Sequence, residues 1–126
     1  MSDRYERGLA AYASQFGIDE SEVEAWFEER FGRRFGAEAI NAAGGAWGDG
    51  ALSLRDRSLV VVTALIALGG VEQRLGRHVQ WALEHGLTPE ELEELVAFLA
   101  VYVGYPRASM GGAVVREELE RRSGPA

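Results

Sequence analysis

Apolar residues recur at helical spacing from the start of the chain. The first stripe has members three or four residues apart: Tyr5, Leu9, Tyr12 and Phe16. This spacing places them on one face of a helix, and the Gly17 that follows is a common helix end. Asp19, with Glu22 three residues later, is a capping pattern that starts a second helix. The beginning of the chain therefore predicts two amphipathic helices, the second ending at Gly32.

The next stretch carries weaker helical signals. Segment 41–52, NAAGGAWGDGAL, is rich in glycine and other small residues, which is typical of a loop. Trp47 is a large apolar residue inside it. This side chain either anchors the predicted loop onto the core, or covers a pocket or a subunit contact. The pattern leaves both interpretations open.

A long apolar run dominates the middle of the chain. Ser53, with Asp56 three residues later, is a capping pattern that precedes the run Leu59–Leu68. The run is apolar on nearly all sides, which is typical of a helix buried in a core. A pair of glycines follows it. We therefore predict a central buried helix that stops at Gly69.

Three further helices are predicted after this one. The first covers roughly residues 71–85. The segment LTPEEL, 87–92, then provides a threonine N-cap and a proline at the first helical position of the next helix. That helix runs to about Val103, where Gly104 and a nearby proline break it. A last helix extends to about Arg122.

No segment shows the alternating pattern of a strand. The sequence therefore predicts an all-α, single-domain helical bundle of about six helices. Residues 1–50 are expected to form N-terminal helices and the glycine-rich loop, and residues 51–122 to form the helical core. A length of 126 residues and a hydrophobic content of 47% suit one compact core.

Composition and charge exclude several classes of function. The net charge is −7 and no basic stripe occurs, so neither nucleic acid nor an anionic membrane is an expected partner. The chain has no cysteine, which excludes disulfides, thiolate metal sites and cysteine-based redox chemistry. The first ten residues, MSDRYERGLA, are too polar for a signal peptide, and the longest apolar run is too short to span a bilayer. A cytoplasmic protein is expected.

Candidate chemistry is densest in GGVEQRLGRH, residues 69–78. On a helix, Arg74 and His78 share one face at the edge of an apolar stripe. An imidazole at such an edge serves as a general acid or base near neutral pH, and an arginine binds a carboxylate through two hydrogen bonds. These groups suit a small organic acid. A structural histidine beside solvated arginines fits the same spacing.

Trp81 and His85 extend the row of Arg74 and His78 along the same helix. The two histidines are about 10 Å apart along the helix axis, too far to share one ion, so no metal site is predicted. His85 is expected to be a cation that favours the helix C-terminus, or a partner of a backbone carbonyl. No nucleotide-binding motif occurs, and no cofactor is expected.

A second suggestive segment is VYVGYPRA, residues 101–108. It places Tyr102, Tyr105 and an arginine where one helix stops and the next begins. Phenols donate hydrogen bonds and helix N-termini attract anions, so this corner is a candidate part of a binding site. A packed helix corner without a ligand is the alternative interpretation.

Two segments in this order resemble the carboxymuconolactone decarboxylase family. They are LSLRDRSLVVVTALIALGG and EQRLGRHVQWALEHGLTPEELEELVAFLAVYVGYPRA, and the resemblance covers about residues 52–115. It implies an all-α fold of the alkylhydroperoxidase D type and a homo-oligomer, commonly a trimer or hexamer. Relatives of the alkylhydroperoxidase D type use a Cys-x-x-Cys pair and a histidine for redox chemistry. The corresponding segment here has no cysteine, so that activity is not expected.

The decarboxylase branch of this family removes CO₂ from a carboxylated lactone without a cofactor. By resemblance, His78 matches the family histidine and Glu72 matches the glutamate of the same segment. Tyr102 and Pro106 match the helix corner. The sequence departs from the family pattern in two places. Ser58 replaces the usual glutamate, and the segment that ends at His78 is one residue longer.

The residues and the resemblance together predict a cofactor-independent decarboxylase that acts on a carboxylated lactone or a related small organic acid. His78 is expected to transfer a proton, and Glu72 to orient the imidazole or an arginine. The expected substrate-binding residues are Arg74, Arg77, Tyr102, Tyr105 and Trp47. The alternative prediction is a non-catalytic oligomeric module that binds a small molecule or serves as a scaffold.

Overall fold

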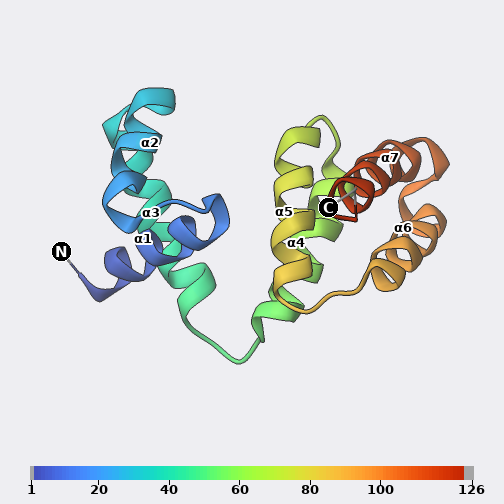
Figure 1. Cartoon of the computed structure of the whole chain (residues 1–126), viewed down its shortest axis with the longest axis horizontal. Coiled ribbons are helices and arrows are strands. Elements are labelled where there is room, and N and C mark those ends of the chain that lie inside the picture. The colour runs from blue at the N-terminus through green and yellow to red at the C-terminus, as the bar shows by residue number, and fades with distance from the viewer. Residues whose placement is uncertain (1, 124–126) are drawn as a thin grey trace. The chain divides into compact units, whose positions relative to one another are not determined.

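The computed structural model describes residues 2–123, which form helices and their connections, with no strand among them. In chain order the elements are α1 (Asp3–Phe16), the 3-10 helix η1 (Glu20–Glu22), α2 (Val23–Phe31), α3 (Arg33–Gly48), α4 (Leu54–Leu68), α5 (Glu72–Glu84), α6 (Pro89–Val103) and α7 (Tyr105–Arg122) (Figure 1). The all-α prediction is confirmed. The described residues hold seven α-helices, where about six were expected. None of these helices is both long and apolar enough to cross a membrane.

The helices belong to two compact units, one within residues 1–51 and the other within residues 52–126. The first unit contains α1 to α3, and its buried core residues are Leu9, Val23, Phe27 and Ile40. Aromatic rings surround this small core. The ring centroid of Tyr12 on α1, for example, lies 4.7 Å from that of Phe27 on α2.

The glycine-rich segment is helical, so the loop predicted over residues 41–52 is wrong for most of its length. α3 continues to Gly48, and its glycines allow very close packing on α1. A Cβ atom on Gly44 would stand 1.7 Å from the carbonyl oxygen of Arg4. A side chain cannot fit in that space, so the small residues serve helix packing and not flexibility. Trp47 consequently lies half-buried on a helix and not in a loop.

Local capping signals start the helices where the sequence predicts. Asp19 and Glu22 form a capping box at η1. Thr88 and Glu91 form another at α6, with both reciprocal hydrogen bonds present. Ser53 caps α4 through its side-chain oxygen. Such caps satisfy the free N–H groups of a first helical turn, so they fix the residue at which each helix begins.

Four helices enclose one core in the second unit. α5 and α7 pack against α4, and α6 packs against α7 (Figure 1). The buried core residues are Val62, Ile66, Leu75, Val79, Ala82, Leu87, Leu92, Leu99, Val115 and Leu119. Gly111 lets α7 approach α4, because a Cβ atom there would lie 2.8 Å from Cγ1 of Ile66. Close packing of this kind leaves α5 with one face in the core and one face toward solvent.

The prediction that α4 is buried on nearly all sides is wrong. Ser58, Val62 and Ile66 are four residues apart and form its buried face. Val60 and Leu68 are 58% and 64% exposed. Packing covers only part of the helix surface, whereas the apolar run continues around the whole helix. α4 therefore presents an exposed apolar face.

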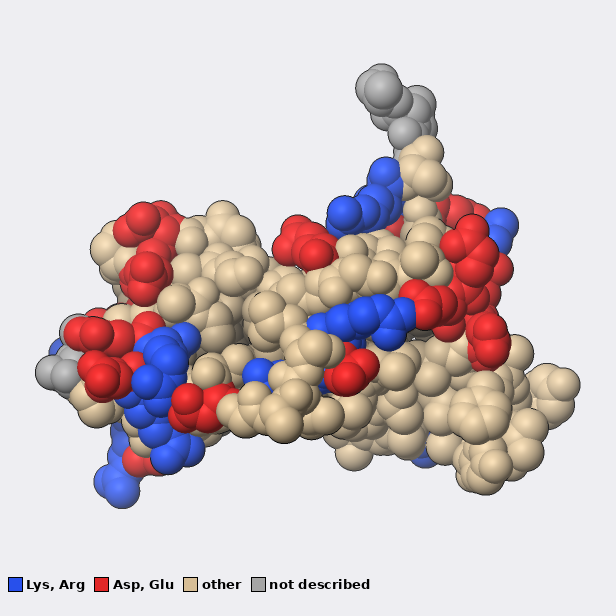
Figure 2. Space-filling model, turned by 90° about the horizontal axis from the view of Figure 1, so that it is seen from below, with Lys and Arg blue, Asp and Glu red and all other residues tan. Residues whose placement is uncertain are grey.

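Charged side chains of both signs are interspersed on the face shown in Figure 2. In the second unit, Arg116 of α7 lies 3.0 Å from Glu120 and 3.3 Å from Glu93 of α6. All three side chains are exposed, so each pair contributes little to stability.

Candidate active site

Helix α5 carries the largest group of candidate residues. Its buried face includes Leu75, Val79 and Ala82, which belong to the core of the second unit. Arg77 and His78 lie beside this face and are half-buried. The helical period therefore places the His78 imidazole at the boundary between the core and the surface, as the sequence predicts.

Three aromatic rings line one side of α5. The ring centroids of His78 and Trp81 are 5.9 Å apart, and those of Trp81 and His85 are 4.7 Å apart. Trp81 is only 4% exposed. The indole is thus a buried bridge between two imidazoles, and the row predicted from helical spacing is confirmed.

The surroundings of His78 keep its imidazole neutral. Burial is the largest cause, followed by the positive charges of Arg77 and then Arg74, and together they lower the pKa of His78 from 6.5 to about 4. At neutral pH His78 is therefore an uncharged base with two guanidinium groups close to it. The structure brings these three predicted site residues together.

His85 is held by a residue from another helix. Its Nδ1 atom lies 2.7 Å from the Oγ atom of Ser58 on α4. Burial lowers the pKa of His85, which exceeds the opposing effect of Glu84. The predicted carbonyl contact stays a prediction, whereas the predicted cation is disfavoured by the lowered pKa of His85. Its position at the end of α5 does not outweigh the cost of charging a partly buried ring.

Ser58 stands out in the sequence only as a departure from the family pattern, yet one signal indicates its role. It is a polar residue at the same four-residue spacing as Val62 and Ile66, which are buried. A hydroxyl at an inward position needs a hydrogen-bond partner. The identity of that partner is not predictable from the pattern, because His85 lies 27 residues further along the chain.

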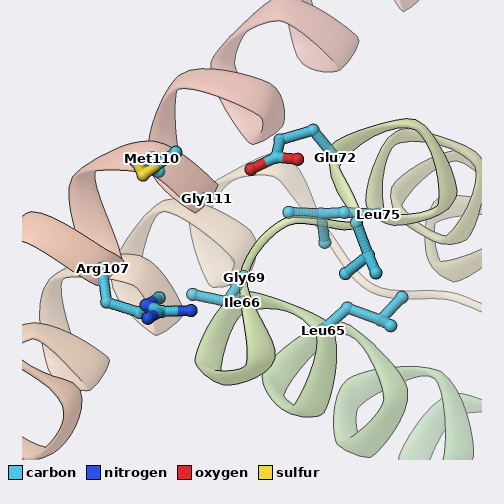
Figure 3. A pocket seen from close by; sticks show the side chains of 9 residues that line it. Leu65, Ile66, Gly69, Glu72, Leu75, Arg107, Met110 and Gly111 are labelled. Atoms are coloured by element: carbon cyan, nitrogen blue, oxygen red, sulfur yellow. The ribbon is translucent and has the colours of Figure 1, made fainter.

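Glu72 lies at the other end of α5, in a separate pocket. The residues that line this pocket are Leu65, Ile66, Gly69, Val71, Glu72, Leu75, Arg107, Met110 and Gly111 (Figure 3). Its cavity volume is about 10 Å³, which is room for about one water molecule. The Glu72 carboxylate accepts a hydrogen bond from the N–H of Gly70 at 3.3 Å. His78 does not line this pocket and lies about 9 Å further along the helix axis, so one chain does not bring Glu72 and His78 together.

Arg107 lines the same pocket from α7. Its guanidinium donates a hydrogen bond to the carbonyl oxygen of Leu68, at the end of α4. In the sequence, Arg107 follows Tyr102 and Tyr105 in the segment that is a candidate part of a binding site. The structure instead uses this arginine to satisfy a carbonyl at a helix C-terminus, where a cation is favourable.

The two predicted tyrosines are surface residues. Tyr102 is 72% exposed and Tyr105 is 80% exposed. The ring of Tyr102 packs edge-on against Phe98, with centroids 5.3 Å apart. Neither tyrosine lines the pocket of Glu72.

Trp47 belongs to α3 in the first unit. Within residues 2–123, no group of three or more His, Asp or Glu side chains is suited to a metal ion.

Comparison with known proteins defines the class of this chain. The model of the carboxymuconolactone decarboxylase family matches residues 34–117, from the start of α3 through most of α7. The chain belongs to this family. The match begins well before residue 52, so it includes α3, the helix that the sequence pattern alone did not predict.

A particular relative is 4-carboxymuconolactone decarboxylase from Acinetobacter baylyi. It is 35% identical over 85 residues, which are 68% of this chain and 62% of that protein. The chain thus matches less than two thirds of the length of the relative. Across this matched part, similarity extends beyond the short motifs around His78.

Proposed function

We propose that the protein is a cofactor-independent decarboxylase that acts on a carboxylated lactone or a related small organic acid. Membership of the family and similarity to a protein named 4-carboxymuconolactone decarboxylase support this class of reaction. One observation carries the proposal. The half-buried His78 has Arg77 and Arg74 close enough to lower its pKa, so α5 carries a base beside two groups that can bind a carboxylate.

In this reaction Arg74 or Arg77 binds a carboxylate of the substrate. The bound anion offsets the positive charges that disfavour the imidazolium form, and the pKa of His78 rises toward neutrality. His78 then holds the proton that the reaction needs. When the bond to the departing carboxylate breaks, CO₂ leaves and the electron pair delocalises into the lactone. The imidazolium donates its proton to the resulting carbanion and is protonated again by water.

The remaining site residues act in an assembly of several copies. We propose a homo-oligomer, a trimer or hexamer, in the cytoplasm. Phe98, Val101, Tyr102 and Tyr105 are apolar or aromatic side chains between 58% and 80% exposed on α6 and the start of α7. An exposed group of this kind is typical of a subunit contact. In the assembly, Tyr102 and Tyr105 complete the substrate pocket, and Glu72 orients the imidazole or an arginine of a neighbouring copy. Trp47 of the first unit stays a proposed substrate-binding residue.

Turnover by the His78→Gln variant tests the catalytic proposal. The substrate is a butenolide that carries a carboxylate on the ring carbon next to the ring oxygen, and CO₂ release is measured. Loss of the proton donor is expected to lower kcat by at least about 100-fold. The matched control is Arg116→Gln, an exposed residue of α7 that pairs with Glu93 and Glu120. Equal turnover by the parent protein and His78→Gln would contradict the proposal.

The second candidate function is the non-catalytic binding or scaffold module. One observation favours it. In the second unit, the pocket around Glu72 is lined by Arg107 and apolar side chains and not by His78. A module predicts that a carboxylated lactone binds without release of CO₂. Binding measured by calorimetry, together with turnover on the same sample, separates the two functions.

A further inference from the structure

Ser58 is a buried polar residue with a specific partner. It is 1% exposed, and within residues 2–123 no other polar or charged side chain is classed as buried. Its hydroxyl lies on the inner face of α4, and Oγ is 2.7 Å from Nδ1 of His85. His85 is the C-cap residue that follows α5. This hydrogen bond therefore joins the C-cap of α5 to the buried face of α4.

We assign the Ser58 hydroxyl as the donor of this hydrogen bond. A hydroxyl shielded from water needs an acceptor for its proton, and Nδ1 of His85 is the acceptor within reach. Nδ1 is then unprotonated, and the ring carries its proton on Nε2. Protonating Nδ1 would deprive the Ser58 hydroxyl of this acceptor. The lowered pKa of His85 likewise favours the ring with an unprotonated Nδ1.

The fixed imidazole contacts the next ring in the row. His85 lies 4.7 Å from Trp81 at an interplanar angle of 48°, and Trp81 lies 5.9 Å from His78 at 56°. Trp81 is 4% exposed, so its indole moves only if its neighbours move. The end of a helix frays more readily than its middle, and a side chain there needs an anchor to keep one rotamer.

We propose that Ser58 and His85 are positioning residues for His78. The hydrogen bond fixes the His85 ring, this ring holds Trp81, and Trp81 sets the orientation of the His78 imidazole. The effect on catalysis rests on the proposed function, whereas the effect on the His78 ring does not. Neither Ser58 nor His85 transfers a proton to the substrate in this arrangement.

Two variants break the row at different points. Ser58→Ala removes the hydroxyl and leaves all three rings. His85→Asn keeps an acceptor near the position of Nδ1 but removes the ring that packs on Trp81. Thr63→Val is the matched control, because Thr63 is a partly buried residue of α4 whose hydroxyl bonds to Leu59 within its own helix. Circular dichroism and unfolding by urea identify the folded variants, and His85→Asn serves alone if Ser58→Ala does not fold.

The direct measurement is NMR of the protein with labelled histidine and tryptophan. Both variants are expected to shift and broaden the His78 imidazole signals and the Trp81 indole signal. The control is expected to leave them as in the parent protein. Groups that orient a reacting side chain typically contribute about tenfold or more, so kcat is expected to fall about tenfold while KM stays within about twofold.

The outcomes separate this inference from the proposed function. If His78 and Trp81 signals in both folded variants match the parent, the positioning role is overturned. If these signals change as expected but the parent protein releases no CO₂, the positioning role stands and the proposed function fails. If kcat depends on His78 but is the same in both variants, the positioning role in catalysis is overturned.

Discussion

Gly8 of α1 lies against the backbone of Ile40 in α3 so closely that a Cβ atom on Gly8 would stand 1.7 Å from the Ile40 carbonyl oxygen. Gly44 of α3 makes the corresponding approach to Arg4 of α1. Two helices thus touch backbone to backbone at two points. This contact places Ile40 in the small core of the first unit.

Gly8→Ala is expected to destabilise the first unit. The methyl group meets a carbonyl oxygen of the backbone, which cannot move aside without shifting a helix. Overpacking of this kind costs about 3 kcal/mol. Thermal unfolding followed by circular dichroism measures the loss.

Gly45→Ala is the matched control for that variant. Its Cβ atom would meet the end of the flexible Arg4 side chain, 2.6 Å from one guanidinium nitrogen, and not a backbone atom. Alanine also favours a helix over glycine by about 1 kcal/mol, so the control is expected to unfold near the parent temperature. Equal losses in both variants would contradict the argument from backbone contact.

Stability is expected to fall as the pH decreases from neutral, in part because of His78. Its pKa is about 4 in the folded chain, against 6.5 for an ordinary histidine. Between these pH values the unfolded chain binds a proton that the folded chain does not. The contribution of His78 to the free energy of unfolding is therefore fully present above pH 6.5. It is lost progressively toward pH 4, by about 3 kcal/mol at most.

Urea unfolding of the parent protein and His78→Gln at several pH values isolates this contribution. Carboxylates titrate alike in both proteins, so the difference between the two unfolding free energies reports His78. As the pH falls from 7 to 4, the unfolding free energy of the parent protein is expected to decrease more than that of His78→Gln. Parallel curves would show that His78 is not shielded from protonation.

Removal of Arg77 is expected to raise the pKa of His78. Arg77 has the largest effect among the charged groups that lower this pKa, and Arg74 follows it. Arg77→Gln should therefore raise the pKa more than Arg74→Gln does, and Arg116→Gln should leave it unchanged. NMR titration of the His78 imidazole measures all three. A larger increase for Arg74→Gln than for Arg77→Gln would contradict the stronger effect of Arg77 on the pKa of His78.

Val101→Glu is expected to dissociate the proposed oligomer. Val101 is 78% exposed in the single chain, so a charge there changes the stability of the isolated fold by less than about 0.5 kcal/mol. Inside a subunit contact the same charge is buried without a partner. Light scattering after size exclusion gives the mass, and Ala113→Glu, an exposed site on α7, is the control. An unchanged mass for Val101→Glu would remove this surface from the contact.

The local signals of the sequence predicted most helix boundaries. Capping boxes at Asp19 and Thr88 depend on residues three positions apart, so they form from the chain alone. The rings of His78, Trp81 and His85 also follow from the helical repeat. For the same reason, the spacing along one helix is enough to group His78 with its neighbouring arginines.

The errors arose where distant segments meet. Glycines in α3 weaken a helix locally, yet close contact with α1 requires them, and the tertiary contact outweighs the local preference. The apolar run of α4 indicated burial, but it did not reveal that α5 and α7 cover only one side of that helix. Hydrophobic residues favour burial without specifying which faces receive a partner.

By itself, the sequence determined the helical class, most helix starts and the row of candidate residues on α5, because each depends on residues within a few turns of one another. Only the tertiary structure decided that Ser58 meets His85 and that Glu72 lies in a pocket with Arg107 instead of beside His78. These relationships join helices whose residues are far apart in the chain. They depend on how side chains from different helices fill a shared core, and a repeat along one helix carries no information about that packing.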